Sequence, residues 1–134
     1  MHIQYMLLCE MAREGVRGTF DVLGLLDRVY ASALPAQQPH LAVVALVCAD
    51  SEDDLGTKEV RLRLRGPNGQ IMFEQRGTAR FQPLAGTWLS GVRLIYNLGN
   101  LPLPEAGRYF FELTVGTVSA THPLDVVVGQ PPAA

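Results

Sequence analysis

The sequence predicts an all-β protein, a single two-layer antiparallel β-sandwich of immunoglobulin-like or jelly-roll-like architecture with eight or nine strands. Apolar and polar residues alternate with a period of two, Gly, Pro, Asn and Asp interrupt the alternation at short intervals, and no stretch has a helical period. The 134 residues are 48% hydrophobic and 18% charged, which suits one domain with its own core. We expect that domain over residues 1–129 and a flexible C-terminal tail at residues 130–134.

The first part of the chain predicts three strand regions, of which Ile3 to Cys9 is the first. Thr19 to Tyr30 contains two apolar pieces joined at Gly24, where the missing side chain permits a bulge or a bend from one sheet toward the other. His40 to Ala49 is apolar at nearly every position and therefore suits a central strand covered on both faces. Its valines favour a strand over a short buried helix, which periodicity alone leaves open.

The clearest alternation runs from Lys58 to Arg65. One face of this strand should be buried and carries Val60, Leu62 and Leu64. The other face should be wet and carries Glu59, Arg61, Arg63 and Arg65. The turn Gly66–Gly69 contains a proline and an Asn-Gly pair, so it should fold Ile71 and Phe73 back beside this strand. A further strand piece is expected at Thr78 to Phe81.

Three more strands are expected toward the C-terminus. Trp88 to Leu98 has an inner row formed by Val92, Leu94, Tyr96 and Leu98. Gly107 to Val115 has an inner row formed by Tyr109, Phe111, Leu113 and Val115. Gly116 then reverses the chain into a last strand, in which Pro123 cannot donate a ladder hydrogen bond and indicates an edge or a break. The longest irregular joins should be Ala31 to Pro39 and Leu98 to Gly107.

The net charge and the cysteines indicate which kinds of partner and which cellular compartment to expect. A formal net charge of -2 gives no long-range field for polyanions, which argues against nucleic-acid binding. No apolar run is long enough for a membrane helix, and Met1 to Glu10 lacks the features of a leader, so we expect a cytoplasmic protein without membrane contact. Cys9 and Cys48 both lie in apolar runs and are expected to be free core thiols. A bridge between them would instead require an oxidising compartment.

No catalytic centre, cofactor site or metal site is recognisable in the sequence. Ser90 lacks the leading glycine and the strand-to-helix turn of a nucleophile elbow. The histidines His2, His40 and His122 have no second histidine at metal-ligand spacing. The acidic run Asp50–Asp54 leaves two alternatives open, a calcium loop or a solvated loop kept open by repulsion between like charges.

Two sets of side chains are candidates for contact with a partner. Arg61, Arg63 and Arg65 should project three guanidinium groups from one sheet face, where they can grip an acidic partner. The alternative is that they are soluble outer-face residues that discourage edge pairing. Trp88 follows a join and Phe110 falls on the polar row of its strand. Each of these aromatic side chains either contributes to a partner surface or is covered by a nearby loop.

The segments Cys9–Ala12, Leu23–Val29 and Leu101–Leu113 stand in an order and spacing that resemble a bacterial family of uncharacterised small β-sandwich proteins. In that family a first strand ends in Cys or Ala followed by an acid and Ala, and a Pro-x-x-Gly-x-Tyr-x-Phe-x-Leu run precedes the closing strand. Here Gly18-Thr19 replaces the family's usual basic residue before the second strand. The resemblance implies a sandwich from about Ile3 to Val128. It implies no activity and no functional residues.

These observations favour a non-catalytic interaction or assembly module that binds a protein partner or self-associates through an exposed sheet face or edge. A second hypothesis is a small-ligand or carbohydrate-binding sandwich with Trp88, Tyr96 or Tyr30 as a stacking surface. A third is an enzyme whose residues assemble from distant strands, although no nucleophile, base and orienting group can be placed together from the sequence.

Overall fold

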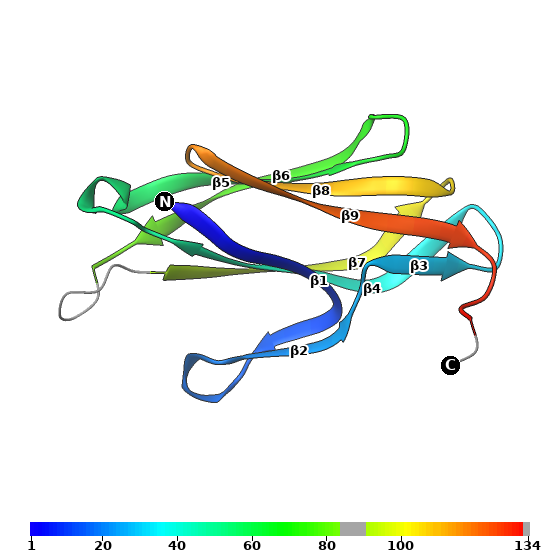
Figure 1. The fold of residues 1–134 in the computed structure, drawn as a ribbon, viewed down its shortest axis with the longest axis horizontal. Coiled ribbons are helices and arrows are strands. Elements are labelled where there is room, and N and C mark those ends of the chain that lie inside the picture. The colour runs from blue at the N-terminus through cyan, green and yellow to red at the C-terminus, as the bar shows by residue number, and fades with distance from the viewer. Residues whose placement is uncertain (84–90, 133–134) are drawn as a thin grey trace.

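The computed structural model describes residues 1–83 and 91–132, and in these ranges two β-sheets pack face to face (Figure 1). The strands are β1 (His2–Glu14), β2 (Phe20–Leu25), β3 (Arg28–Ala31), β4 (Ala36–Cys48), β5 (Gly56–Arg65), β6 (Ile71–Phe81), β7 (Gly91–Leu103), β8 (Gly107–Val115) and β9 (Val118–Val128). Two short 3-10 turns, η1 (Val16–Gly18) and η2 (Glu52–Asp54), lie in the connections. The predicted all-β sandwich with eight or nine strands is confirmed.

The sheets contain four and five strands. The order is β2-β1-β4-β7 in the smaller sheet and β3-β9-β8-β5-β6 in the larger one. All neighbouring strands are antiparallel except β3 and β9, which pair in parallel with Arg28 opposite Asp125. β3 follows the change of sheet after β2 and is the edge strand beside β9. Within the described residues, no helix is long and apolar enough to cross a membrane.

The main core lies between the sheets and is built from inward rows that the sequence predicted. The inward rows of β5 and β8 are at most 2% exposed and consist of Val60, Leu62, Leu64, Tyr109, Phe111, Leu113 and Val115. The predicted inner row of β7 is half-buried, since β7 is an edge strand, and packs against the same core, whereas Leu101 and Leu103 further along β7 are buried. Tyr109 places its ring in the core and donates its hydroxyl hydrogen to the carbonyl of Glu105 at 2.7 Å.

The chain changes sheets shortly after Gly24, as the sequence predicted. Gly24 has a φ of +66°, and a Cβ atom there would come within 2.9 Å of the Glu10 side chain. The amide of Leu26 donates to the carbonyl of Leu8 in the four-stranded sheet, and the carbonyl of Asp27 accepts from Asp125 in the five-stranded sheet. A residue without a side chain therefore permits the bend that links the two layers.

β4 is apolar on both faces because a second layer of residues covers its outer side. β1 leaves β4 after Cys9, and the hairpin formed by residues 10–25, here called the arm, folds back under the smaller sheet (Figure 1). Ala12, Phe20 and Val22 of the arm pack with Cys9 and with Ala42, Val44 and Ile95 of the sheet. Residues from Leu41 to Ala45 are therefore at most 1% exposed. The predicted central strand covered on both faces is confirmed.

Several element boundaries differ from those predicted. β1 continues to Glu14, β4 begins at Ala36, and β7 continues to Leu103, so the predicted irregular joins are partly strand. Backbone pairing extends these elements into segments whose side chains do not alternate clearly, because β4 and β7 pair from Ala36–Leu103 to Cys48–Gly91. The pieces predicted at Ile71 and Thr78 form the single strand β6. Pro123 lies within β9, beside the part of that strand that β3 does not reach.

We predict that Leu62→Ala lowers the free energy of unfolding by about 2–5 kcal/mol, because the substitution leaves a cavity between two packed sheets. Urea denaturation followed by circular dichroism measures this loss. The matched control is Ile71→Ala on β6, where the side chain is 51% exposed and the expected change is within about 0.5 kcal/mol. Equal losses at the two positions would contradict the placement of Leu62 in the core.

Candidate interaction surfaces

The three predicted arginines project from the outer face of the five-stranded sheet. Arg61, Arg63 and Arg65 alternate on β5 with the buried residues of the inward row, so their side chains share one face. Their side-chain exposures are 38%, 17% and 35%. The structure thus brings the three residues together as predicted, but none of them is fully exposed to solvent.

Two glutamates neutralise part of this face. Glu74 on β6 contacts Nη2 of Arg63 at 2.9 Å, Nε of Arg61 at 3.5 Å and Nη2 of Arg76 at 3.4 Å. Arg65 donates to Glu112 on β8. The hydrogen bond from Arg63, helped by the other guanidinium charges, holds the pKa of Glu74 below its ordinary value. Many of the guanidinium contacts that were predicted for an acidic partner are therefore made with carboxylates of the same sheet. We call this set of arginines and glutamates the guanidinium face.

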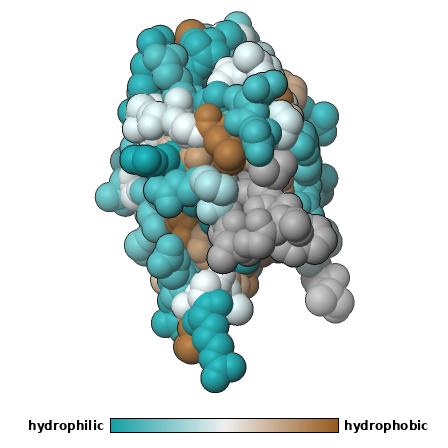
Figure 2. All heavy atoms as spheres, turned by 90° about the vertical axis from the view of Figure 1, so that its left-hand side faces the viewer, coloured by the Kyte–Doolittle hydropathy of each residue, from teal (hydrophilic) through white to brown (hydrophobic). Residues whose placement is uncertain are grey.

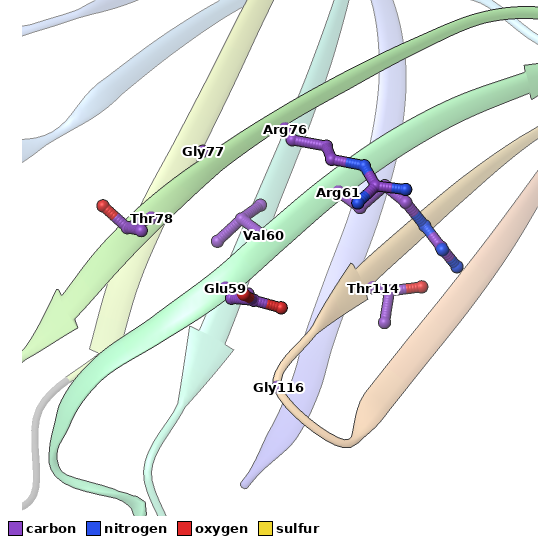
Figure 3. Close-up of a pocket in the computed structure, with 8 residues that line it drawn as sticks. All are labelled: Glu59, Val60, Arg61, Arg76, Gly77, Thr78, Thr114 and Gly116. Atoms are coloured by element: carbon purple, nitrogen blue, oxygen red, sulfur yellow. The ribbon is translucent and has the colours of Figure 1, made fainter.

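A hollow of about 470 Å³ opens beside Arg61 on the guanidinium face. Its lining includes Glu59 and Arg61 from β5, Arg76 and Thr78 from β6, and Thr114 from β8. In Figure 3 the side chains of Arg61 and Arg76 run to the same side of the sheet, toward β8, whereas Thr78 lies at the opposite end. Arg76, Glu74 and Thr114 were not found from the sequence. Only the strand register places these three residues beside the arginines of β5, and composition and periodicity do not provide that register.

Of the two aromatic residues predicted to contact a partner, the structure describes Phe110 but not Trp88. Phe110 is half-buried on the outer row of β8, where it lies opposite Arg65 on one side and Pro123 on the other. It therefore shares the face of the arginines, although it does not line the hollow. Trp88 falls outside the residues that the structure describes, as does Ser90. Tyr30 points outward on β3 and Tyr96 packs toward the core on β7, so these two tyrosines do not form one stacking surface.

The arm carries a second candidate surface that the sequence analysis did not single out. Met11 lies opposite Leu23 on the row of the arm that alternates with Ala12 and Val22, and Leu25 lies beyond Gly24 on β2, opposite Cys9. These side chains are 52%, 63% and 70% exposed. We call these three residues the arm face. β2 is the edge strand of its sheet, so its outer backbone groups lie beside this apolar row.

The end of the sandwich that contains the arm's hairpin turn differs from the arm face in its hydrophobicity. The coloured part of this end is largely hydrophilic, with hydrophobic side chains that stand apart from one another (Figure 2). Isolated exposed hydrophobic residues are normal on soluble proteins. The arm face differs because Met11 and Leu23 lie directly opposite each other across a strand pair and Leu25 is next to them on β2.

The acidic run and His2 are held by the protein's own groups. Asp54 accepts hydrogen bonds from the backbone amides of Asp50 and Ser51, at 2.9 and 3.3 Å. The Met1 ammonium group contacts both aspartates, which lowers their pKa values. His2 lies 2.7 Å from Asp50. Within residues 1–83 and 91–132, no three His, Cys, Asp or Glu side chains are grouped so that they could hold a metal ion.

The two cysteines are free thiols, as predicted. Cys9 is fully buried beneath the arm, with its sulfur 3.7 Å from the carbonyl oxygen of Ala42. Cys48 is only half-buried, and its sulfur lies 3.3 Å from the side-chain oxygen of Gln4. Burial raises the pKa of both thiols, which makes each a weaker nucleophile than an ordinary cysteine.

The chain belongs to a family of unknown function, DUF6941, whose model matches residues 4–127. The match includes β2 to β8 and nearly all of β1 and β9, and it agrees with the predicted resemblance to a family of uncharacterised small domains. No curated protein matches the chain. The family therefore carries no activity over to the guanidinium face or to the arm.

We predict that Glu74→Gln destabilises the fold at neutral pH, because three guanidinium groups lose their shared carboxylate. The lowered pKa of Glu74 means that this contribution is present above the ordinary carboxyl value of about 4.3 and is lost as pH falls through the lowered value. The variant should therefore lose stability less steeply than the parent on acidification. Thermal unfolding at a series of pH values measures both effects.

The control for this prediction is Glu52→Gln, which removes an equal charge in η2 and away from the guanidinium face. Identical pH profiles for Glu74→Gln and Glu52→Gln would show that Glu74 has no special role.

Proposed function

We propose that this protein is a non-catalytic assembly module that self-associates through the arm face and the free edge of β2. The observation that supports this most directly is that the exposed apolar side chains and the edge of β2 lie side by side. Met11, Leu23 and Leu25 are exposed apolar neighbours on the arm, and among the described residues the strand carrying two of them is the edge of its sheet. The occupant of this surface in our proposal is a second copy of the same chain.

Symmetry favours a second copy over an unrelated partner. Two β2 strands can pair antiparallel about a two-fold axis, which brings the same short segment of each chain together. Each arm face then continues into that of the other copy, so both the apolar side chains and the edge backbone groups find partners of their own kind. The net charge of -2 per chain produces little repulsion between two copies.

The expected affinity is modest. Burying a Leu or Met side chain fully contributes about 1.5–3 kcal/mol, and the dimer would bury three such side chains from each copy, in part. Association costs roughly 4–15 kcal/mol in lost translational and rotational freedom. The balance favours a reversible dimer that forms at raised protein concentration rather than a permanent one.

A cytoplasmic location and a role without catalysis are parts of the same proposal. The location is supported by the two free thiols, which suit a reducing compartment. A non-catalytic role is supported by the raised pKa of both thiols and by the internal partners of the described acidic clusters.

We predict that the parent protein increases in weight-average mass across a roughly hundredfold rise in concentration, as mass action requires. Leu23→Lys should abolish the increase, because it places a charge in the middle of the apolar row on both copies. Sedimentation velocity measures the mass, and circular dichroism checks that the variant is folded. Leu23 is already 63% exposed, so the substitution should leave the core intact.

Ile71→Lys is the matched control, since Ile71 is also an exposed aliphatic side chain but lies on β6 in the other sheet. It should associate like the parent. A parent that stays monomeric over the whole range, or a loss of association in both variants alike, would refute assembly through the arm.

A further inference from the structure

The strand register places two arginines directly opposite each other on the guanidinium face. Arg61 on β5 pairs with Arg76 on β6, and on its other side Arg61 pairs with Thr114 on β8. Directly opposite residues share a face of the sheet, and their Cβ atoms lie about 4.5–5.5 Å apart. Two like charges in such a pair destabilise a sheet unless a negative group lies between them.

The protein's own carboxylates supply only part of that negative charge. Two carboxylates, Glu74 and Glu112, contact the four arginines of this face, which are Arg61, Arg63, Arg65 and Arg76. Arg63 holds Glu74 at 2.9 Å, so Arg61 and Arg76 reach it only at 3.5 and 3.4 Å. The buried Nε of Arg63 has no hydrogen-bond acceptor within the described residues. The face therefore has more donors and more positive charge than its acceptors satisfy.

The hollow beside these two arginines has room for a ligand group. It opens over the Arg76–Arg61–Thr114 row, with a volume of about 470 Å³ (Figure 3). Arg76 is 72% exposed and Arg61 38% exposed, so both guanidinium groups are accessible from the solvent. The hydroxyl of Thr114 adds a neutral donor on the β8 side of the same row.

We propose that this hollow binds the oxygens of a carboxylate or phosphate group, held between Arg61 and Arg76 with Thr114 as a third contact. Guanidinium groups present paired N–H donors that match two oxygens of such an anion. The bound anion would lie between two like charges and remove their repulsion. This site is separate from the arm face, because it lies on the outer side of the other sheet.

Glu59 sets a limit on the ligand. It lines the same hollow and comes two residues before Arg61 on the outer row of β5. Its carboxylate repels a second anionic group placed at that end, so the hollow should prefer a ligand with one anionic group over an extended polyanion. This preference agrees with the chain's small net charge of -2.

The test is an NMR titration of 15N-labelled protein with sodium phosphate, compared with sodium chloride at equal ionic strength. Phosphate should cause saturable shifts in the side-chain Nε signals of Arg61 and Arg76 and in the amide of Thr114. Arg61→Gln and Arg76→Gln should each weaken the apparent Kd by about tenfold or more, because each removes charge-assisted hydrogen bonds. The matched control, Arg80→Gln, removes an exposed arginine of β6 that does not line the hollow, and should bind like the parent.

A second arm of the experiment distinguishes the source of the anion. A blocked peptide that contains a single aspartate presents the carboxylate of a protein partner, whereas phosphate presents a free anion. Saturable binding of either probe that depends on Arg61 and Arg76 supports the site and assigns its source. Binding that is equal in Arg76→Gln and Arg80→Gln, or shifts with both phosphate and the peptide no larger than those with chloride, would overturn the proposal. Unchanged dispersion of the variant spectra shows that they are folded.

Discussion

The inward rows of β5 and β8 occupy the space between the two sheets, with Leu62, Leu64 and Phe111 fully removed from solvent. Because successive residues of an extended strand point to opposite faces, burial of these rows forces the intervening residues outward. The guanidinium face is therefore a consequence of core packing. A slip of one residue in β5 would place Arg63 in the core and Leu62 in water, which is costly in both directions. This cost fixes which side chains of β5 are available to a ligand.

β4 shows how the same constraint acts on a strand without a polar row. Both of its rows are apolar, so the side away from the main core needs a cover, and the arm supplies one with Ala12, Phe20 and Val22. The guanidinium group of Arg93 lies 5.0 Å from the ring of Phe20, which adds a cation–π contact near the tip of the arm. The arm is itself a strand pair, so covering β4 with one side turns the other side to solvent. Exposure of the arm face follows from burial of β4.

Local pattern predicted much of this architecture. The inner rows of β5 and β8, the central position of β4 and the change of sheet near Gly24 all follow from alternation and from glycine's tolerance of positive φ. The folded arm and the parallel contact of β3 with β9 were not predicted. Both depend on which distant segments pack together, and residues 10–25 carry similar apolar residues on both sides of the hairpin. Periodicity cannot state which of those sides is covered.

The Arg61–Arg76 pair shows why the candidate site needed the register as well as the pattern. A two-residue loop at Pro67 and Asn68 would pair Gly66 with Gly69 and place Arg61 opposite Glu74, which would give a simple ion pair. Instead Gly66 donates to the carbonyl of Gln70, and a register shift between Leu64 and Arg65 moves β6 further along. Arg61 then faces Arg76, and one carboxylate is divided among three arginines. The register shift at the turn thus gives the guanidinium face excess positive charge in place of a balanced Arg–Glu pair. Because this face and the arm face lie on opposite outer sides of the sandwich, a ligand on one does not obstruct a second copy on the other.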